Sequence, residues 1–212
     1  MIGPAIWICT KYAGDTSPLL NISASVIQGS AIGPASFSVT ASDLRPVHSH
    51  NDMTKFADDV YLLIPSFYLN TTEEELASIE LWSNNNNLQL NKAKSREILF
   101  HAPRSKALSI SPPSPLDGII RVDTLKCLGV TLQSNFSFRE HINDVISNCA
   151  SNLFALRTLR SKGLNSDVTV TVFKSTVLSK ITYASQFWWG FVGASEKERL
   201  EAFLRKARRC NF

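Results

Sequence analysis

Two adjacent carboxylates, Asp58 and Asp59, are the residues of this sequence best suited to bind a metal ion. They lie in the segment 55–65 between two short runs of strand-forming residues, which predicts a strand–turn–strand with both aspartates at the turn. Neighbouring carboxylates repel each other unless a cation lies between them, and Lys55 is the only other charge in the segment. Magnesium binds carboxylate oxygens and often bridges to substrate phosphates. One interpretation is therefore a magnesium site of the polymerase type, and the alternative is a surface turn with two solvated aspartates.

A second candidate binding segment is the run Gln28-Gly29-Ser30, which is followed by Gly33-Pro34. Glycine lets a backbone approach a ligand closely, and serine is a good helix N-cap. Free amides at the start of a helix favour phosphate or another anion. The alternative is a tight packing turn that binds nothing.

The elements that must position these segments are a mixture of strands and helices up to about residue 135. Apolar alternation predicts a strand within residues 19–27, and further strands are expected at 98–100, 119–122 and 126–132, the last with Gly129 inside it. A helix is expected over 71–90, because Thr72 and Glu75 match a capping box and an apolar face follows.

From residue 137 the pattern becomes helical. One helix is expected from Ser137 to Gly163, a second from about Ser166 to the aromatic run 187–189, and a third from Ser195 with basic residues on its outer face. The change in pattern predicts an α+β fold with a mixed region, residues 1–135, and an all-α region, residues 136–212.

Composition limits the class of protein. The chain has 212 residues, of which 44% are hydrophobic, so a packed core is expected rather than disorder. The net charge is +4, and basic residues gather at the C-terminus. Four separated cysteines predict reduced thiols, and a zinc site from Cys9, His48 and His50 is a minor alternative. No run has the length of a membrane span or the pattern of a signal peptide, so an intracellular location, nuclear or cytoplasmic, is expected.

The order of the motifs resembles the reverse transcriptases of non-LTR (LINE-type) retrotransposons, most closely the jockey-like and chicken-repeat-like elements. The resemblance covers almost the whole chain. Gln28-Gly29-Ser30 with Gly33-Pro34 resembles motif B of that family, Phe56-Ala57-Asp58-Asp59 resembles motif C, Leu88 to Asn91 with Lys94 resembles motif D, and Leu128-Gly129-Val130 resembles motif E, the primer grip. Phe138 to Ile142 and the segments around Tyr183, Trp188 and the Arg-rich C-terminus resemble the thumb.

The resemblance implies a right-hand polymerase, with a partial palm of antiparallel sheet and helices followed by a helical thumb, that copies RNA into DNA from dNTPs. It implies that Asp58 and Asp59 bind Mg²⁺, with Mn²⁺ as a possible substitute, for two-metal nucleotidyl transfer. Residues Gln28, Gly29 and Ser30 would shape the site of the incoming nucleotide and the template. Lys94 would assist the pyrophosphate leaving group, and Leu128 and Gly129 would lie against the DNA primer.

At the basic end of the chain, the resemblance implies contacts with nucleic-acid phosphates by Arg205, Lys206, Arg208 and Arg209, and the alternative is an ordinary solvated helix face. No membrane partner and no obligate protein partner is expected.

One family motif has no counterpart in the sequence. Motif A supplies a further essential aspartate upstream of motif B, and Asp15, the only acidic residue before Gln28, lies in a loop-like context. The chain is therefore expected to represent a palm fragment with a thumb and to have little or no polymerase activity alone. A non-catalytic nucleic-acid-binding remnant and an inert, poorly folded product are the alternatives.

Overall fold

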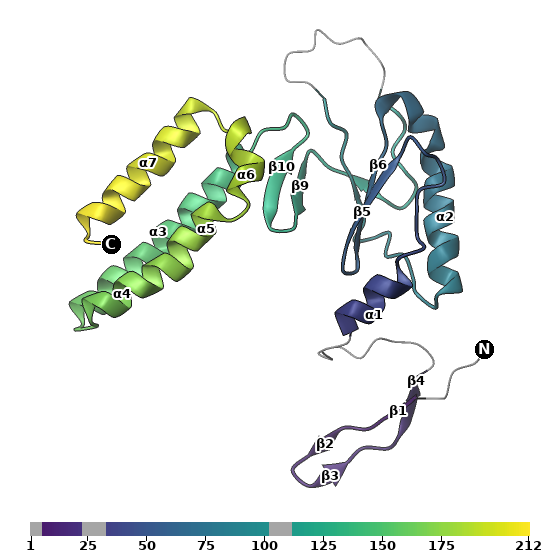
Figure 1. The fold of residues 1–212 in the computed structure, drawn as a ribbon, viewed down its shortest axis with the longest axis horizontal. Coiled ribbons are helices and arrows are strands. Elements are labelled where there is room, and N and C mark those ends of the chain that lie inside the picture. Colours follow the sequence, from purple (N-terminus) through teal and green to yellow (C-terminus); the bar gives the residue numbers. More distant parts are fainter. Residues whose placement is uncertain (1–5, 23–32, 102–111) are drawn as a thin grey trace. The chain divides into compact units, whose positions relative to one another are not determined.

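The computed structural model describes residues 6–22, 33–101 and 112–212. The chain divides into two compact units, Met1–Asn91 and Lys92–Phe212. Within the described ranges the strands pair two by two, in four antiparallel pairs and one parallel pair, and helices follow (Figure 1). This mixture agrees with the expected α+β class. The predicted division into a palm, 1–135, and a thumb, 136–212, is a division by function, and it stays a proposal.

The described part of the first unit consists of paired strands followed by helices (Figure 1). β1 (Ile6–Ile8) pairs with β4 (Leu20–Ile22), and the segment between them forms a second pair, β2 (Lys11–Tyr12) with β3 (Asp15–Thr16). After α1 (Gly33–Thr40), a separate hairpin pairs β5 (Asp52–Phe56) with β6 (Asp59–Leu63). A 3-10 helix, Ser66–Thr71, leads into α2 (Thr72–Asn85). The strand predicted within 19–27 is observed in part as β4, and its residues 23–27 lie outside the described ranges.

Three expectations for this unit and the next are wrong in detail. The capping box at α2 does not form, because Thr71 is the N-cap and Glu75 bonds to a preceding loop instead. The strand expected at 98–100 is displaced to β7 (Arg96–Glu97), which pairs in parallel with β8 (Ile120–Arg121). The single strand expected over 126–132 is a hairpin of β9 (Thr124–Cys127) and β10 (Val130–Gln133).

The second unit is dominated by packed helices (Figure 1). The long helix α3 (Arg139–Ser161) contacts both α4 (Ser166–Phe173) and α7 (Ala194–Arg209). From α4 the helix continues through a π-helical segment, Lys174–Leu178, into α5 (Ser179–Thr182). α5 ends at Thr182, Tyr183 leaves the helical conformation, and Ala184 is left-handed (φ 50°) before α6 (Ser185–Trp188), so the expected continuous helix to residue 189 is interrupted.

The core of this unit is built from the apolar faces that the helical periodicity predicts. One cluster joins α3, α4 and α7 and contains Val145, Cys149, Leu153, Leu156, Phe173, Val177, Phe203 and Ala207. A second cluster joins the β9–β10 hairpin to the helices and contains Val130, Leu132, Phe138, Ile142, Trp188, Val192 and Leu200. Over the described ranges, none of the helices is both long and apolar enough to span a bilayer.

Candidate functional site

The β5–β6 hairpin presents the two aspartates, as the strand–turn–strand pattern predicts. Phe56 pairs with Asp59 across the hairpin, so Ala57 and Asp58 form the two-residue turn and Asp59 is the first residue of β6. Ala57 has a positive φ of 49°, which is typical of the tight turns that join two antiparallel strands. Both carboxylates are exposed, and Asp59 Oδ2 accepts a long hydrogen bond of 3.5 Å from the Tyr61 hydroxyl.

Lys55, the one cation in the segment, does not neutralise the aspartates. Its Nζ donates to the backbone carbonyls of Ala41 and Leu44, with a distance of 2.7 Å to the latter. In the part of the chain that the structure describes, neither Asp58 nor Asp59 forms an ion pair. The two negative charges therefore stand next to each other in solvent, where a cation can approach them.

The donor set suits magnesium in its chemistry. Carboxylate oxygens are hard ligands, and Mg²⁺ is commonly held by one or two carboxylates together with waters and substrate phosphates. Among the described residues, no group of three or more His, Cys, Asp or Glu side chains is placed to hold an ion. Asp58 and Asp59 thus offer two ligands, and the other positions would be filled by water and substrate.

The minor alternative, a zinc site from Cys9, His48 and His50, gains no support. The His48 Nε2 atom lies 2.8 Å from Glu74 Oε2, and the His50 ring stacks on Tyr68 with 4.3 Å between centroids. Each imidazole is thus engaged with a neighbour on the 3-10 helix or α2.

Glu75 is a buried residue that binds the loop before β5, a role that the sequence pattern did not predict. Its two carboxylate oxygens accept hydrogen bonds from the backbone N–H of Val47 and His48, both at 2.9 Å, and one also accepts from Asn51 Nδ2 at 2.8 Å. Burial alone would raise the pKa of this carboxyl, but the hydrogen bonds from Asn51, His48 and Val47 together hold the pKa below its usual 4.5. Because Asn51 directly precedes β5, Glu75 anchors the loop that leads into the aspartate hairpin.

The second candidate segment can be followed only in part. Gln28, Gly29 and Ser30 lie outside the described residues. Gly33, the next motif residue, is buried at the start of α1, and the helix extends to Thr40.

The remaining predicted site residues belong to the unit Lys92–Phe212. Lys94 is exposed in a turn before β7. Leu128 and Gly129 form the turn of the β9–β10 hairpin, with φ values of 45° and 86°, and the Tyr183 hydroxyl donates to the Leu128 carbonyl at 2.8 Å. Each of these residues is exposed, and the hydrogen bond from Tyr183 fixes the turn against the end of α5.

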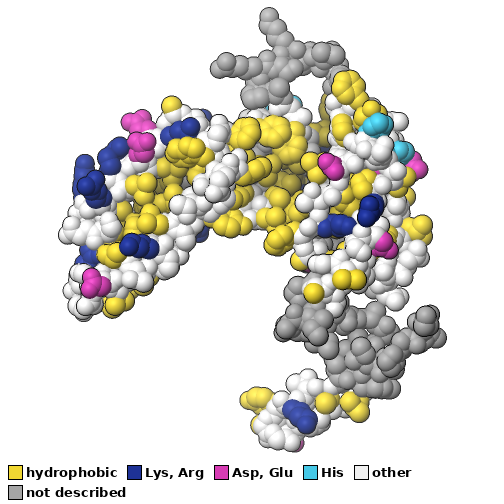
Figure 2. Space-filling model, viewed as in Figure 1, with side chains coloured by type: hydrophobic (Ala, Val, Ile, Leu, Met, Phe, Trp, Pro, Cys, Tyr) yellow, Lys and Arg dark blue, Asp and Glu magenta, His cyan; other side chains and the backbone are white. Residues whose placement is uncertain are grey.

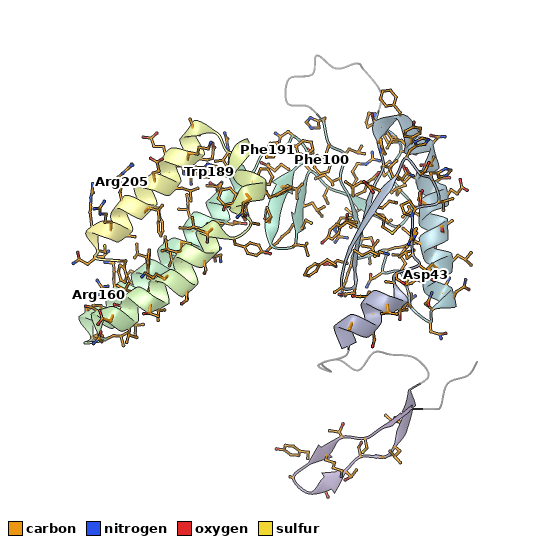
Figure 3. All side chains as sticks on the ribbon, viewed as in Figure 1. Asp43, Phe100, Arg160, Trp189, Phe191 and Arg205 are labelled. Atoms are coloured by element: carbon orange, nitrogen blue, oxygen red, sulfur yellow. The ribbon has the colours of Figure 1, made fainter. Side chains whose placement is uncertain are left out.

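The basic residues of α7 lie on the face of the helix away from the core. Leu200, Phe203 and Ala207 are buried. The exposed basic residues are Arg205, Lys206, Arg208 and Arg209, and Figure 2 shows Lys and Arg side chains gathered over this helix. Arg205 (Figure 3) approaches Glu201 one turn earlier at 3.5 Å, a contact of little energetic weight at such an exposed site.

A row of half-exposed aromatic rings, not singled out from the sequence, lies near the β9–β10 hairpin. Phe100 stacks on Phe136 with 4.6 Å between centroids, and Phe136 lies 6.2 Å from Phe191 (Figure 3). Lys197 Nζ lies 4.9 Å from the ring centre of Trp189, which precedes Phe191 in the same 3-10 helix. The clustered aromatics of 187–191 were the available signal, but Phe100 and Phe136 join them only through the fold.

Comparisons with known proteins decide the family resemblance. The chain is 28% identical to the probable RNA-directed DNA polymerase from transposon BS of Drosophila melanogaster, over 88% of the chain and 22% of that protein. It is 26% identical to the RNA-directed DNA polymerase from mobile element jockey of the same species, over 92% of the chain and 22% of that protein. The chain is similar to the reverse transcriptases of non-LTR mobile elements. This confirms the resemblance that the motif order predicts.

The similarity to reverse transcriptases covers most of this chain but only a part of each relative. The chain spans about a fifth of the length of the curated relatives that it matches. A third relative, the probable RNA-directed DNA polymerase from transposon X-element of D. melanogaster, is 25% identical over 89% of the chain. No protein-family model matches the chain, and no solved structure matches it. The roles of individual residues therefore stay predictions.

Proposed function

We propose that this chain supplies the catalytic aspartates and part of the nucleic-acid surface of a reverse transcriptase. The observation that carries the proposal is the exposed Asp58-Asp59 pair at the turn of a β-hairpin, in a chain similar to RNA-directed DNA polymerases over most of its length. RNA template, DNA primer and dNTPs would be its substrates, inside the cell.

In this proposal Asp58 and Asp59 hold Mg²⁺, or Mn²⁺ in its place, through their exposed oxygens. When bound, the metal would supply positive charge against the phosphoryl oxygens of the nucleotide and the attacking 3′-oxygen. Lys94 would donate to the pyrophosphate leaving group, and Gln28, Gly29 and Ser30 would shape the nucleotide and template site. The mixed region, 1–135, would act as palm and the helical region, 136–212, as thumb.

The nucleic acid would be held by contacts that do not read sequence. The exposed turn Leu128-Gly129 would lie against the primer backbone. The outer face of α7 would neutralise phosphates through Arg205, Lys206, Arg208 and Arg209, which makes binding fall steeply with salt.

The polypeptide 1–212 is expected not to extend primers by itself. Its described residues offer two carboxylates at the hairpin and no third acidic ligand near them, and Asp15 lies on the separate β2–β3 hairpin. Extension of an RNA-templated primer by this polypeptide, lost on Asp58→Ala, would contradict that expectation.

A second candidate function, nucleic-acid binding without catalysis, is favoured by a separate observation. Stacked half-exposed rings at Phe100, Phe136 and Phe191 can accept unpaired bases, as aromatic platforms do in single-strand-binding proteins. Salt-dependent binding of single-stranded RNA or of an RNA–DNA hybrid with a single-stranded overhang, without Asp58-dependent primer extension, would favour this candidate over the first.

The polymerase proposal is tested by transplanting the chain into a relative. Residues 1–212 replace the matching segment of the jockey polymerase of D. melanogaster, and primer extension on RNA is measured. Asp58→Asn is expected to lower extension by at least about a hundredfold, because it removes charge at the reacting phosphates. Asp52→Asn is the matched control, since it makes the same change at the opposite, exposed end of the β5–β6 hairpin. Equal activity of both variants would refute the role of Asp58.

A further inference from the structure

A proline-rich segment, residues 112–116, lies at the surface of the second unit before β8. Three of its residues are prolines, which fix φ near about −65°, and a residue before a proline is held in an extended conformation. Pro113 and Leu116, one period of three apart, are half-buried, while the rest of the segment is exposed. This is the repeat of a polyproline II helix, which has three residues per turn. The segment therefore turns one edge to the protein and carries Ser114 outside that edge.

The side chain of Arg121, on β8, ties this segment to the protein. Its Nη1 donates to the Pro113 carbonyl at 2.6 Å, and its Nη2 donates to the Ser114 carbonyl at 3.0 Å. The same guanidinium forms a bidentate pair with the Glu97 carboxylate of β7, at 2.8 and 3.0 Å. Because two successive carbonyls of the segment bond to Arg121, the backbone is held in its extended shape.

Two exposed serines of the described ranges precede a proline, and the fold treats their hydroxyls differently. The Ser114 hydroxyl forms no hydrogen bond with any described residue. The Ser17 hydroxyl accepts from the Thr10 N–H at 2.9 Å and donates to the Pro18 carbonyl at 3.2 Å. The Ser17 N–H also donates to the Thr10 carbonyl at 2.9 Å. Ser114 is therefore available to an incoming reactant, whereas Ser17 is engaged on both its hydroxyl and its backbone.

A free serine hydroxyl in front of a proline suits one class of phosphoryl transfer. A protein kinase brings the serine oxygen to the γ-phosphorus of ATP and takes the hydroxyl proton on a carboxylate. The residue after the serine normally brings a backbone N–H that needs an acceptor, but proline has none. A kinase with an apolar pocket at that position therefore selects proline, and Pro115, exposed directly after Ser114, meets this requirement.

We propose that Ser114 is a phosphorylation site for a proline-directed protein kinase. In the reaction, the Ser114 oxygen bonds to the γ-phosphorus of ATP, and the bond from that phosphorus to the bridging oxygen breaks. ADP leaves, and the hydroxyl proton passes to a carboxylate of the kinase. The proposal goes beyond the proposed function and depends neither on metal binding at Asp58 nor on nucleic-acid binding.

The modification would act on the contacts of Arg121. A phosphoserine carries a charge of about −1.5 to −2 at neutral pH. Because Arg121 already bonds to the Ser114 carbonyl, the phosphate is introduced beside a guanidinium that also holds Glu97. Phosphate forms strong, bidentate hydrogen bonds with arginine. Phosphorylation is therefore expected to draw Arg121 away from Glu97, the side-chain link between β7 and β8.

The test treats the folded 212-residue chain with a recombinant mitogen-activated protein kinase and radiolabelled ATP. All variants carry Ser111→Ala, which removes the Ser-Pro pair outside the described residues. Incorporation is expected to vanish in Ser114→Ala and to persist in Ser17→Ala, the matched control. Pro115→Ala is expected to slow incorporation at least about tenfold, because alanine brings back an N–H without an acceptor in the kinase. No incorporation into the folded chain, equal incorporation with Ser114→Ala, or an undiminished rate with Pro115→Ala would overturn the proposal.

Peptides 10–22 and 107–121, the second again with Ser111→Ala, test whether the fold makes the selection. Both peptides are expected to be phosphorylated, because each has a Ser-Pro pair without the contacts of the folded chain. In the folded chain, Ser114 should react at least about tenfold faster than Ser17, whose hydrogen bonds must break first. Equal rates at the two serines of the folded chain, or the same preference in the peptides, would overturn the selection by the fold.

A second measurement follows Arg121 directly. In the ¹⁵N-arginine-labelled chain, the Nε signal that is absent from Arg121→Lys is expected to shift when Ser114 is phosphorylated. The Nε signal of Arg139, assigned in the same way, is the control, because this arginine of the same unit also pairs with a glutamate, Glu196. An unmoved Arg121 signal in the fully phosphorylated chain would overturn the effect on Glu97 but leave the phosphorylation site standing.

Discussion

The buried carboxylate of Glu75 gives the sharpest test of how the aspartate hairpin is supported. Glu75→Gln keeps the shape of the side chain but replaces one acceptor oxygen by an N–H donor that faces other donors, the N–H groups of Val47 and His48 and the amide of Asn51. At least one charge-assisted hydrogen bond is lost, and one buried donor is left unsatisfied. Together these are expected to lower the free energy of unfolding of the first unit by about 3 kcal/mol.

The assay for Glu75→Gln is amide hydrogen exchange, which reports on each compact unit separately. The amides of Val47, His48 and α2 should lose protection while those of α3 keep it. Glu73→Gln is the matched control, because it removes the same charge from an exposed position in the same first turn of α2 and is expected to cost less than about 1 kcal/mol. Equal loss of protection in both variants would refute the anchoring role of Glu75.

The pH dependence of the same unit follows from the direction of the Glu75 pKa. Because the folded-state pKa lies below the usual 4.5, the ionised carboxylate stabilises the fold above that value, and this contribution is lost as the pH falls through the lower, folded-state pKa. Glu75→Gln should remove this acid-dependent part of the protection.

Two further predictions concern the second unit. In a urea titration, Gly129→Ala should lower the free energy of unfolding of this unit by about 2 kcal/mol, because alanine is strained at φ 86° and its Cβ would lie 3.3 Å from the Tyr183 ring. The control Gly190→Ala should be nearly neutral in the same titration, because a Cβ at that position meets no atom within 4 Å. Arg160→Lys should speed amide exchange at the end of the chain, because the Arg160 guanidinium donates to the Cys210 carbonyl at 2.6 Å and lies 3.9 Å over the Phe212 ring. The control is Arg157→Lys at an exposed position, which should leave exchange unchanged. Unchanged exchange in both variants would contradict this role of Arg160.

Local sequence patterns were sufficient to predict those helices and strands whose own residues indicate the element. The strand-forming runs on either side of Asp58 and Asp59 predict the β5–β6 hairpin, and the apolar faces predict α3 and α7. Gly163, at φ 96°, follows the end of α3 as a glycine after a helix usually does.

The errors arise where long-range contacts override a local pattern. Thr72 and Glu75 match a capping box, but Glu75 is drawn to the backbone of a loop almost thirty residues earlier in the chain. Leu128-Gly129 lacks the Asn-Gly or Asp-Gly signal of a tight hairpin, so the β9–β10 hairpin was expected to be one strand. The aromatic row joins distant segments, because only the fold brings Phe100 and Phe136 next to Phe191.

The most direct test of the central claim is whether Asp58 and Asp59 bind a divalent cation as a pair. Mn²⁺, a paramagnetic substitute for Mg²⁺, is added to the ¹⁵N-labelled 212-residue chain, and the loss of amide signals is mapped. We expect the turn at Ala57–Val60 to lose its signals first, and Asp58→Asn/Asp59→Asn, but not Asp52→Asn, to abolish the effect. Signals at the turn that survive Mn²⁺, or that are lost equally in the double variant, would contradict the claim that this hairpin is a polymerase metal site.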